Sequence, residues 1–138
     1  MATNNIFVNL PVKDLEKTKE FFSKVGFEFN PQFTNEQAAC MVISDSIYAM
    51  LLVEEFFHSF IQSTKKEIVD ATRQTEVIVA LSADSRDEVN ELVNRALEAG
   101  ATPYNEPVDH GFMYAWSFQD LDGHLWEIVY MDQNAAQQ

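Results

Sequence analysis

Glu127 is the residue of this sequence with the clearest potential for chemistry. It ends the segment Asp120-Leu-Asp-Gly-His-Leu-Trp-Glu127, in which a turn sequence leads into an apolar run that predicts a strand. A carboxylate on a strand with apolar neighbours could act as a general base or could bind a cationic or hydroxylated ligand. Local hydrogen bonds could equally satisfy the carboxylate, and the sequence leaves both interpretations open.

His110 is the second candidate for a chemical role. It lies between Asp109 and Gly111, before a predicted strand, so its imidazole could overhang a site from a loop. The other histidines, His58 and His124, fall in different predicted elements, and the three lack the spacing of metal ligands. Because His124 directly follows a turn sequence, we expect it to cap that turn or to lie on the surface.

Aromatic side chains occupy one side of the strand predicted over residues 112–118. Side chains alternate along a strand, so every second residue faces the same way. The aromatic side is made by Phe112, Tyr114 and Trp116. This side could stack a planar or amphipathic ligand, with the Tyr114 hydroxyl orienting it, or it could pack against a helix.

Motifs for several other chemistries are missing. The single cysteine, Cys40, lies in an apolar stretch without a basic neighbour, which favours a buried small hydrophobe over a nucleophile. The sequence has no Gly-rich phosphate loop, no Gly-x-Ser-x-Gly elbow and no Cys-x-x-Cys pair. Nucleotide hydrolysis, serine esterase activity and thiol redox chemistry are therefore not indicated.

Length and charge narrow the class of protein further. The 138 residues suit one globular domain, and 9 Lys and Arg against 22 Asp and Glu give a net charge of -13. Such a negative surface repels phosphate backbones and anionic headgroups, so we expect neither nucleic acid nor membranes as partners. The first residues lack the pattern of a signal peptide, and the longest apolar run, residues 49–53, is too short to span a bilayer. We therefore expect a cytoplasmic protein.

The secondary-structure pattern repeats once along the chain. Strands are predicted over residues 5–12, 27–30, 37–44, 47–53, 75–82, 101–104, 112–118 and 124–131. One helix is expected between Asp14 and Gly26, and another between Ser85, which begins a capping box with Glu88, and Gly100. A connecting helix is expected within residues 54–74, and residues 132–138 form a polar tail.

Each half thus reads as strand, helix, strand, strand, strand. The first βαβββ module spans about residues 4–57 and the second about 75–132, within a single domain over 1–138. Residues 5–14 align with residues 76–84, and Gly26 aligns with Gly100. The sequence therefore predicts an α+β fold of two repeated modules.

The doubled module resembles a known superfamily. Leu10-Pro-Val-Lys-Asp-Leu-Glu-Lys-Thr-Lys-Glu-Phe-Phe22 and the segment from Asp120 to Glu127 are similar to motifs of the glyoxalase, bleomycin-resistance and extradiol-dioxygenase superfamily, the vicinal oxygen chelate proteins. The resemblance covers nearly the whole chain. It implies a curved mixed sheet around a cleft, and a homodimer, because members commonly pair.

The resemblance also implies where a metal ion would bind. Metal-dependent members use one side chain from the first and one from the last strand of each module, and these positions match Phe7, Met50 (Leu51 in a shifted register), Ile78 and Glu127. Only Glu127 can coordinate a metal, whereas catalytic centres usually need three protein ligands. We therefore expect no metal or other cofactor, with Phe7, Met50 and Ile78 forming an apolar wall of a ligand site.

The resemblance favours a protein that binds a small organic molecule in its cleft, for sequestration or for metal-independent chemistry. The bleomycin-binding members are the precedent, and their cationic ligands would be attracted by the negative charge of this chain. The alternative is a metal-dependent lactoylglutathione lyase or extradiol dioxygenase with a displaced metal site, formed for example by Glu127 and His110. A structural or partner-binding domain is a third possibility.

Overall fold

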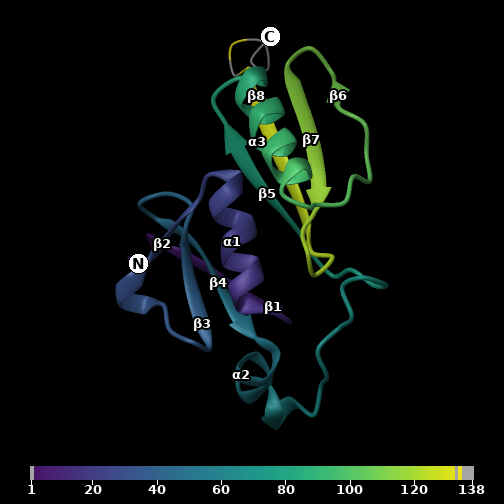
Figure 1. The fold of residues 1–138 in the computed structure, drawn as a ribbon. Helices are drawn as coiled ribbons and strands as arrows, with labels where there is room; N and C mark the ends of the chain where they lie inside the picture. Colours follow the sequence, from purple (N-terminus) through teal and green to yellow (C-terminus); the bar gives the residue numbers. More distant parts are fainter. Residues whose placement is uncertain (1, 133, 135–138) are drawn as a thin grey trace. The chain divides into compact units, whose positions relative to one another are not determined.

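The computed structural model describes residues 2–132 and 134, and it contains two βαβββ modules (Figure 1). The chain divides into two compact units between Val69 and Asp70. The predicted α+β architecture of two repeated modules is confirmed, and each module forms its own four-stranded mixed sheet.

The first module places its helix after its first strand. Its elements are β1 (Ile6–Val12), α1 (Leu15–Val25), β2 (Glu28–Asn30), the 3-10 turn η1 (Pro31–Phe33), β3 (Ala38–Val42) and β4 (Ile47–Val53). The strand order is β1-β4-β3-β2, with β1 parallel to β4 and the other pairs antiparallel. The Asp14 carboxylate caps α1 by accepting a hydrogen bond from the Lys17 N–H at 3.1 Å, and Gly26 ends the helix with φ 123°. Fully buried Phe22 and Leu51 belong to its core.

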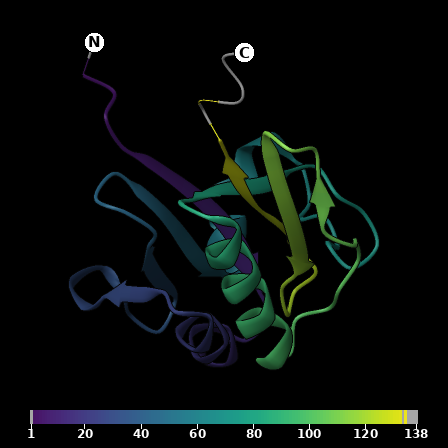
Figure 2. The same cartoon turned by 90° about the horizontal axis from the view of Figure 1, so that it is seen from above.

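The second module repeats this plan. Its elements are β5 (Ile78–Ala83), α3 (Arg86–Glu98), β6 (Val108–Asp109), β7 (Met113–Gln119) and β8 (Leu125–Met131), in the sheet order β5-β8-β7-β6. Figure 2 shows β6 beyond β7, at the end of the sheet away from β5. The predicted capping box forms: Ser85 Oγ accepts from the Glu88 N–H at 3.1 Å, and the Glu88 carboxylate accepts from the Asp84 N–H at 2.7 Å.

The predicted connecting helix is wrong for most of its length. Only α2 (Glu54–Ser59) and the 3-10 turn η2 (Gln62–Thr64) form within residues 54–74. The Ser59 and Thr64 hydroxyls donate to backbone carbonyls three residues earlier, an alternative to continued helix. Lys65 then adopts a left-handed φ of 63°, which stops any helix there.

The strand predicted over residues 101–104 is also wrong. Thr102 alone bridges to β7, through two backbone hydrogen bonds with Gln119 of 2.9 and 2.8 Å. Pro103 has no N–H to continue such a ladder. The short strand β6 forms instead, four residues later, and pairs with β7.

The remaining predicted strands and helices lie close to their expected positions, and β4 occupies the predicted residues. The predicted polar tail falls outside the described residues except for Asp132 and Asn134. No helix in the described part of the chain is long and apolar enough to cross a membrane.

The turn between β7 and β8 is held tightly by a neighbouring segment. Gly123 has φ 92°, and a Cβ atom placed there would lie 2.7 Å from the Ala71 carbonyl oxygen. Any side chain at this position would therefore meet backbone as well as adopt a strained conformation.

We predict that Gly123→Ala destabilises the protein by about 2–4 kcal/mol, because backbone strain and overpacking add. Gly111→Ala is the matched control, since Gly111 has φ 84° but nothing within 4 Å of an added methyl group. The control should lose only about 1–2 kcal/mol, from strain alone. Urea denaturation of both variants measures the difference, and equal losses would contradict the close approach of Ala71.

Candidate functional site

Glu127 lies at the centre of the second sheet, on β8. It pairs with Ala80 of β5 on one side and with Ser117 of β7 on the other. The carboxylate therefore stands in a row of three residues across three strands, between two small neighbours. Glu127 is half-buried.

The two faces of this sheet differ in what covers them. The Tyr114 hydroxyl donates a 2.6 Å hydrogen bond to Asn90 Oδ1 of α3, so the Tyr114 side of the sheet is the side that α3 covers. Ser117 is three residues further along β7 and therefore faces the opposite way, as does its partner Glu127. We call this opposite side the Glu127 face. By the strand register it carries Ile78, Ala80, Ser82, Met113, Ala115, Ser117, Gln119, Leu125, Glu127, Val129 and Met131.

A cavity of about 540 Å³ lies along β5 and β8 in this module. Four of its lining residues belong to the Glu127 face: Ala80, Ser82, Val129 and Met131. The other four are Leu81, Ala83, Asp84 and Tyr130, so the wall mixes polar and apolar groups. Glu127 adjoins the cavity through its direct neighbour Ala80. The Glu127 face thus combines a carboxylate with adjoining space of the size that small-molecule sites have.

Ser117 is the second polar residue in the row. Its side chain is only 3% exposed, and its Oγ has no hydrogen-bond partner among the residues that the structure describes. Buried hydroxyl groups are nearly always hydrogen-bonded, because an unmade hydrogen bond costs stability. Among the described residues this hydroxyl is therefore a buried group with unused hydrogen-bonding capacity.

The predicted aromatic side of β7 does form, but it faces away from Glu127. Tyr114 and Trp116 lie on the side that α3 covers, and the Trp116 indole N–H donates to the Asn105 carbonyl at 3.0 Å. Phe112 precedes β7 and is 42% exposed. Within the second module, Tyr114 and Trp116 thus lie on the other side of the sheet from Glu127. A ligand-binding role for the three aromatic residues stays a prediction.

His110 is held in the loop between β6 and β7. Its backbone N–H donates to the Met113 carbonyl at 2.8 Å, and Met113 precedes Ser117 by four residues. At about 3.3 Å per residue, His110 is therefore displaced by about 13 Å along the sheet from the row that contains Glu127. The structure does not bring the two predicted catalytic residues together within the second module.

The same loop is fastened to α3 by a charged cluster. Arg86 Nη2 donates to the Gly111 carbonyl at 2.7 Å and to Asp109 Oδ1 at 3.3 Å. The guanidinium also lies 5.9 and 5.6 Å from the ring centres of Tyr114 and Tyr130. The Gly111 N–H and then Arg86 lower the pKa of Asp109 below its usual value. This cluster holds the loop in place rather than forming a site.

The implied metal positions occupy equivalent places in the two modules. In the first sheet, Phe7 pairs with Tyr48 and stacks on its ring at 5.0 Å, and Met50, two residues on, faces the same way. In the second sheet, Ile78 and Glu127 have the same relation.

These four residues do not fit a metal ion. The side chains of Phe7, Met50 and Ile78 offer no oxygen or nitrogen donor, and one carboxylate is too few. Within the described residues, no group of three or more His, Cys, Asp or Glu side chains could hold a metal ion. We therefore derive no chemistry through a metal at these positions.

Cross-strand partners in the first sheet show how the modules differ. Met50 of β4 lies opposite Cys40 of β3, as Glu127 of β8 lies opposite Ser117 of β7. Cys40 is buried, and burial raises the pKa of its thiol. This supports the interpretation of Cys40 as a small hydrophobe rather than a nucleophile.

Asp120 sets the position of β8 from the preceding turn. Its side chain is 5% exposed, and Oδ1 accepts hydrogen bonds from the N–H groups of Asp122 at 2.9 Å and His124 at 3.0 Å. Oδ2 accepts from the indole N–H of buried Trp126 at 2.9 Å. Burial raises the pKa of Asp120, while His124 and these donors oppose the rise. His124 thus belongs to the turn, as expected.

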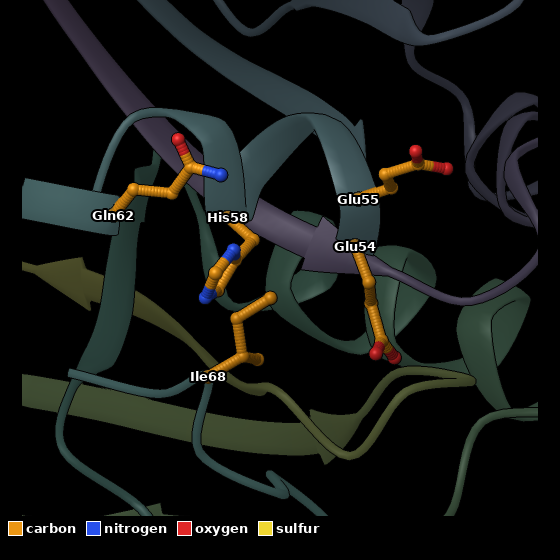
Figure 3. A pocket seen from close by; sticks show the side chains of 5 residues that line it. All are labelled: Glu54, Glu55, His58, Gln62 and Ile68. Carbon is orange, nitrogen blue, oxygen red and sulfur yellow. The ribbon is translucent and has the colours of Figure 1, made fainter. Parts of the chain in front are cut away.

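A second cavity, of about 340 Å³, lies in the first unit beside α2 (Figure 3). It is lined by Glu54, Glu55, His58, Gln62 and Ile68. In Figure 3 the side chains of His58 and Ile68 point toward each other, whereas Glu55 points away. None of the predicted site residues lines it, and its polar residues belong to a short surface helix and the following turn.

Sequence reasoning missed Ser117 and Arg86. Ser117 was visible only as a small residue in an alternating strand, and a pairing register is needed to place it opposite Glu127. Arg86 lies in the first turn of its helix, where its role depends on a loop more than twenty residues away. No local signal in the sequence identifies either residue.

In the comparison with known proteins, the sequence matches the model of one protein family. The family model described as "Glyoxalase/Bleomycin resistance protein/Dioxygenase superfamily" matches residues 6–128, which include strands of both modules and Glu127. No curated protein matches the sequence.

Solved structures share the fold over nearly the whole chain. The hypothetical protein SA1046 from S. aureus is 29% identical, with a TM-score of 0.73 over 91% of this chain and 92% of that one. A bleomycin resistance determinant encoded on transposon Tn5 is 16% identical, with a TM-score of 0.65 over 94% and 99%. The fosfomycin resistance protein FosX from Listeria monocytogenes is 22% identical, with a TM-score of 0.66 over 94% and 92%. At such low identity, the last two show a common fold alone.

Asp120 generates a prediction about pH. Folding raises the pKa of the Asp120 carboxyl, so the protonated form stabilises the folded protein. This contribution to the free energy of unfolding is fully present below the unfolded pKa, about 3.9. It is lost as the pH rises through the folded pKa. Asp120→Asn cannot ionise. The free energy of unfolding of the wild type minus that of Asp120→Asn should therefore fall as the pH rises from about 3 toward neutrality. Urea denaturation at several pH values measures it, with Asp45→Asn as a charge-removal control. A difference that rises with pH would refute the prediction.

Proposed function

The chain belongs to the glyoxalase/bleomycin resistance protein/dioxygenase superfamily, and from this premise we propose that it binds a small organic molecule at the Glu127 face. The family resemblance noted in the sequence is thereby confirmed. The observation that carries the proposal is the single carboxylate of Glu127 in a row of small residues, next to a cavity whose wall includes Ala80, Val129 and Met131. A carboxylate beside a cavity with apolar side chains in its wall suits a ligand site.

The carboxylate favours ligands that donate hydrogen bonds. An ionised Glu127 can only accept, so its complement is an ammonium or a hydroxyl group. The net charge of -13 raises the local concentration of cations around the protein. Val129 and Met131 would contact the apolar part of such a molecule. We therefore infer an apolar amine as the ligand class.

The same residues could serve two functions, sequestration of the ligand or proton transfer from it. Binding alone would sequester the ligand, and a carboxylate beside a bound molecule could also accept a proton from it. Among the structural neighbours, the bleomycin resistance determinant and the fosfomycin resistance protein are both named for resistance to small molecules. Both uses begin with binding, so binding is the first property to test. We propose a cytoplasmic homodimer as the assembly in which it occurs.

The proposed absence of a metal can be tested directly. Metal-stripped protein is titrated with Mn, Fe, Co, Ni and Zn ions while its melting temperature is followed. Because a ligand that binds only the native state raises that temperature, we expect no saturable stabilisation by any of these ions. Saturable stabilisation that disappears in Glu127→Gln would instead support a displaced metal site, and lyase and dioxygenase assays would follow.

The role of Glu127 is tested with a matched pair of organic probes. 2-Phenylethylamine and 2-phenylethanol have nearly the same shape, but only the amine is charged. We expect the amine to bind more tightly, and Glu127→Gln to weaken its binding about tenfold or more, since a charged hydrogen bond contributes about 1.5–3 kcal/mol. Isothermal titration calorimetry measures both affinities.

Glu91→Gln is the control for this experiment. It removes one carboxylate from the exposed surface of α3, on the other side of the sheet, and should leave the affinity for the amine almost unchanged. Equal weakening by both variants would mean that the amine responds to overall charge rather than to a site at Glu127.

A further inference from the structure

The unpartnered hydroxyl of Ser117 is the polar group that the proposed function has not yet used. The residue is only 3% exposed, and no described residue accepts or donates a hydrogen bond at its Oγ. Leaving such a group unsatisfied destabilises a folded protein. Such a hydroxyl is able to hydrogen-bond a bound molecule.

Ser117 and Glu127 form a directly opposed pair on antiparallel strands. Side chains in such pairs lie on one side of the sheet, with Cβ atoms about 4.5–5.5 Å apart. Two polar groups of one ligand can therefore reach both residues only when they are close together in that ligand. Ala80, on the other side of Glu127, has no polar atom in its side chain. The second polar group of a ligand bound to Glu127 must therefore lie toward Ser117.

We propose that Ser117 is the second polar anchor of the Glu127 site and that it selects ligands with a hydroxyl group on the carbon next to the one that bears the amine. This inference rests on the proposed function. The ammonium donates to the Glu127 carboxylate, and the neighbouring hydroxyl exchanges a hydrogen bond with Ser117 Oγ, which can both donate and accept. The ligand class is a vicinal amino alcohol with an apolar remainder.

The chemistry of the row favours this class over a plain amine. A plain amine satisfies Glu127 but leaves the Ser117 hydroxyl without a partner. An amino alcohol satisfies both groups, and sites with buried polar groups discriminate against ligands that leave those groups unpaired. Specificity therefore resides in Ser117, whereas Glu127 contributes most of the affinity.

The experiment compares 2-amino-1-phenylethanol with 2-phenylethylamine, which differ by that hydroxyl group alone. Affinities for the full-length wild type, Ser117→Ala and Ser117→Cys are measured by isothermal titration calorimetry. We expect the wild type to bind the amino alcohol about fivefold more tightly, the contribution of one neutral hydrogen bond. Both variants should lose this preference while they keep their affinity for the plain amine. Ser117→Cys keeps the shape of the side chain and fills the space with a much weaker hydrogen-bonding group, and so controls for the cavity that Ser117→Ala leaves. Ser23→Ala, at an exposed position of α1 in the first module, should change neither affinity.

The ligand-free stability of the variants supplies an independent readout. Removing an unsatisfied buried hydroxyl should raise the melting temperature of Ser117→Ala above that of the wild type. A lower melting temperature would mean that the hydroxyl has a structural partner, and this would overturn the inference.

The binding results separate this inference from the proposed function. If both amines bind through Glu127 with equal affinity, or if the preference survives in both Ser117 variants, the inference about Ser117 fails and the amine site stands. If neither amine binds the wild type, the proposed function fails and the inference fails with it. A fivefold preference that Ser117→Ala and Ser117→Cys both abolish supports the inference.

Discussion

The turn between β7 and β8 is the constraint on which the arrangement of the site depends. The Asp120 carboxylate accepts hydrogen bonds from two backbone N–H groups and from the Trp126 indole, and so fixes where β8 begins. Because side chains alternate, a slip of one residue would turn Glu127 toward α3 and bring Trp126 to the opposite face. A buried carboxylate with three donors therefore decides which side of the sheet carries the carboxylate of Glu127.

The two faces of the second sheet differ in their side chains: one packs against α3, and the other carries Glu127. The α3 side holds the large aromatic rings, the Tyr114–Asn90 hydrogen bond and the Arg86 cluster, which together fasten helix, loop and sheet. The Glu127 face has mostly small or aliphatic side chains and two polar groups in one row. Rigid packing on one side thus leaves the other side free to differ between proteins that share this fold.

Much of the fold was predictable because its signals are local. The Asp14 and Ser85 caps, the alternating strands and the repeat of element order all lie within short stretches of sequence. The errors occurred where tertiary context or backbone detail decides the structure, as in the connecting segment that ends at left-handed Lys65 and in the strand prevented by Pro103. The sequence predicted Glu127 as a site residue, and this role stays a prediction. It could not indicate which aromatic side α3 covers, nor that Ser117 lies opposite Glu127, because both depend on pairing between distant strands.

The pair of Met50 and Cys40 in the first sheet and the pair of Glu127 and Ser117 in the second occupy the same place in two copies of one module. One copy has two sulfur-containing side chains there, and the other has a carboxylate and a hydroxyl. Since the backbone plan is shared, this difference required only side-chain substitutions. One backbone plan thus accommodates a sulfur-containing pair in one module and a polar pair at the equivalent place in the other.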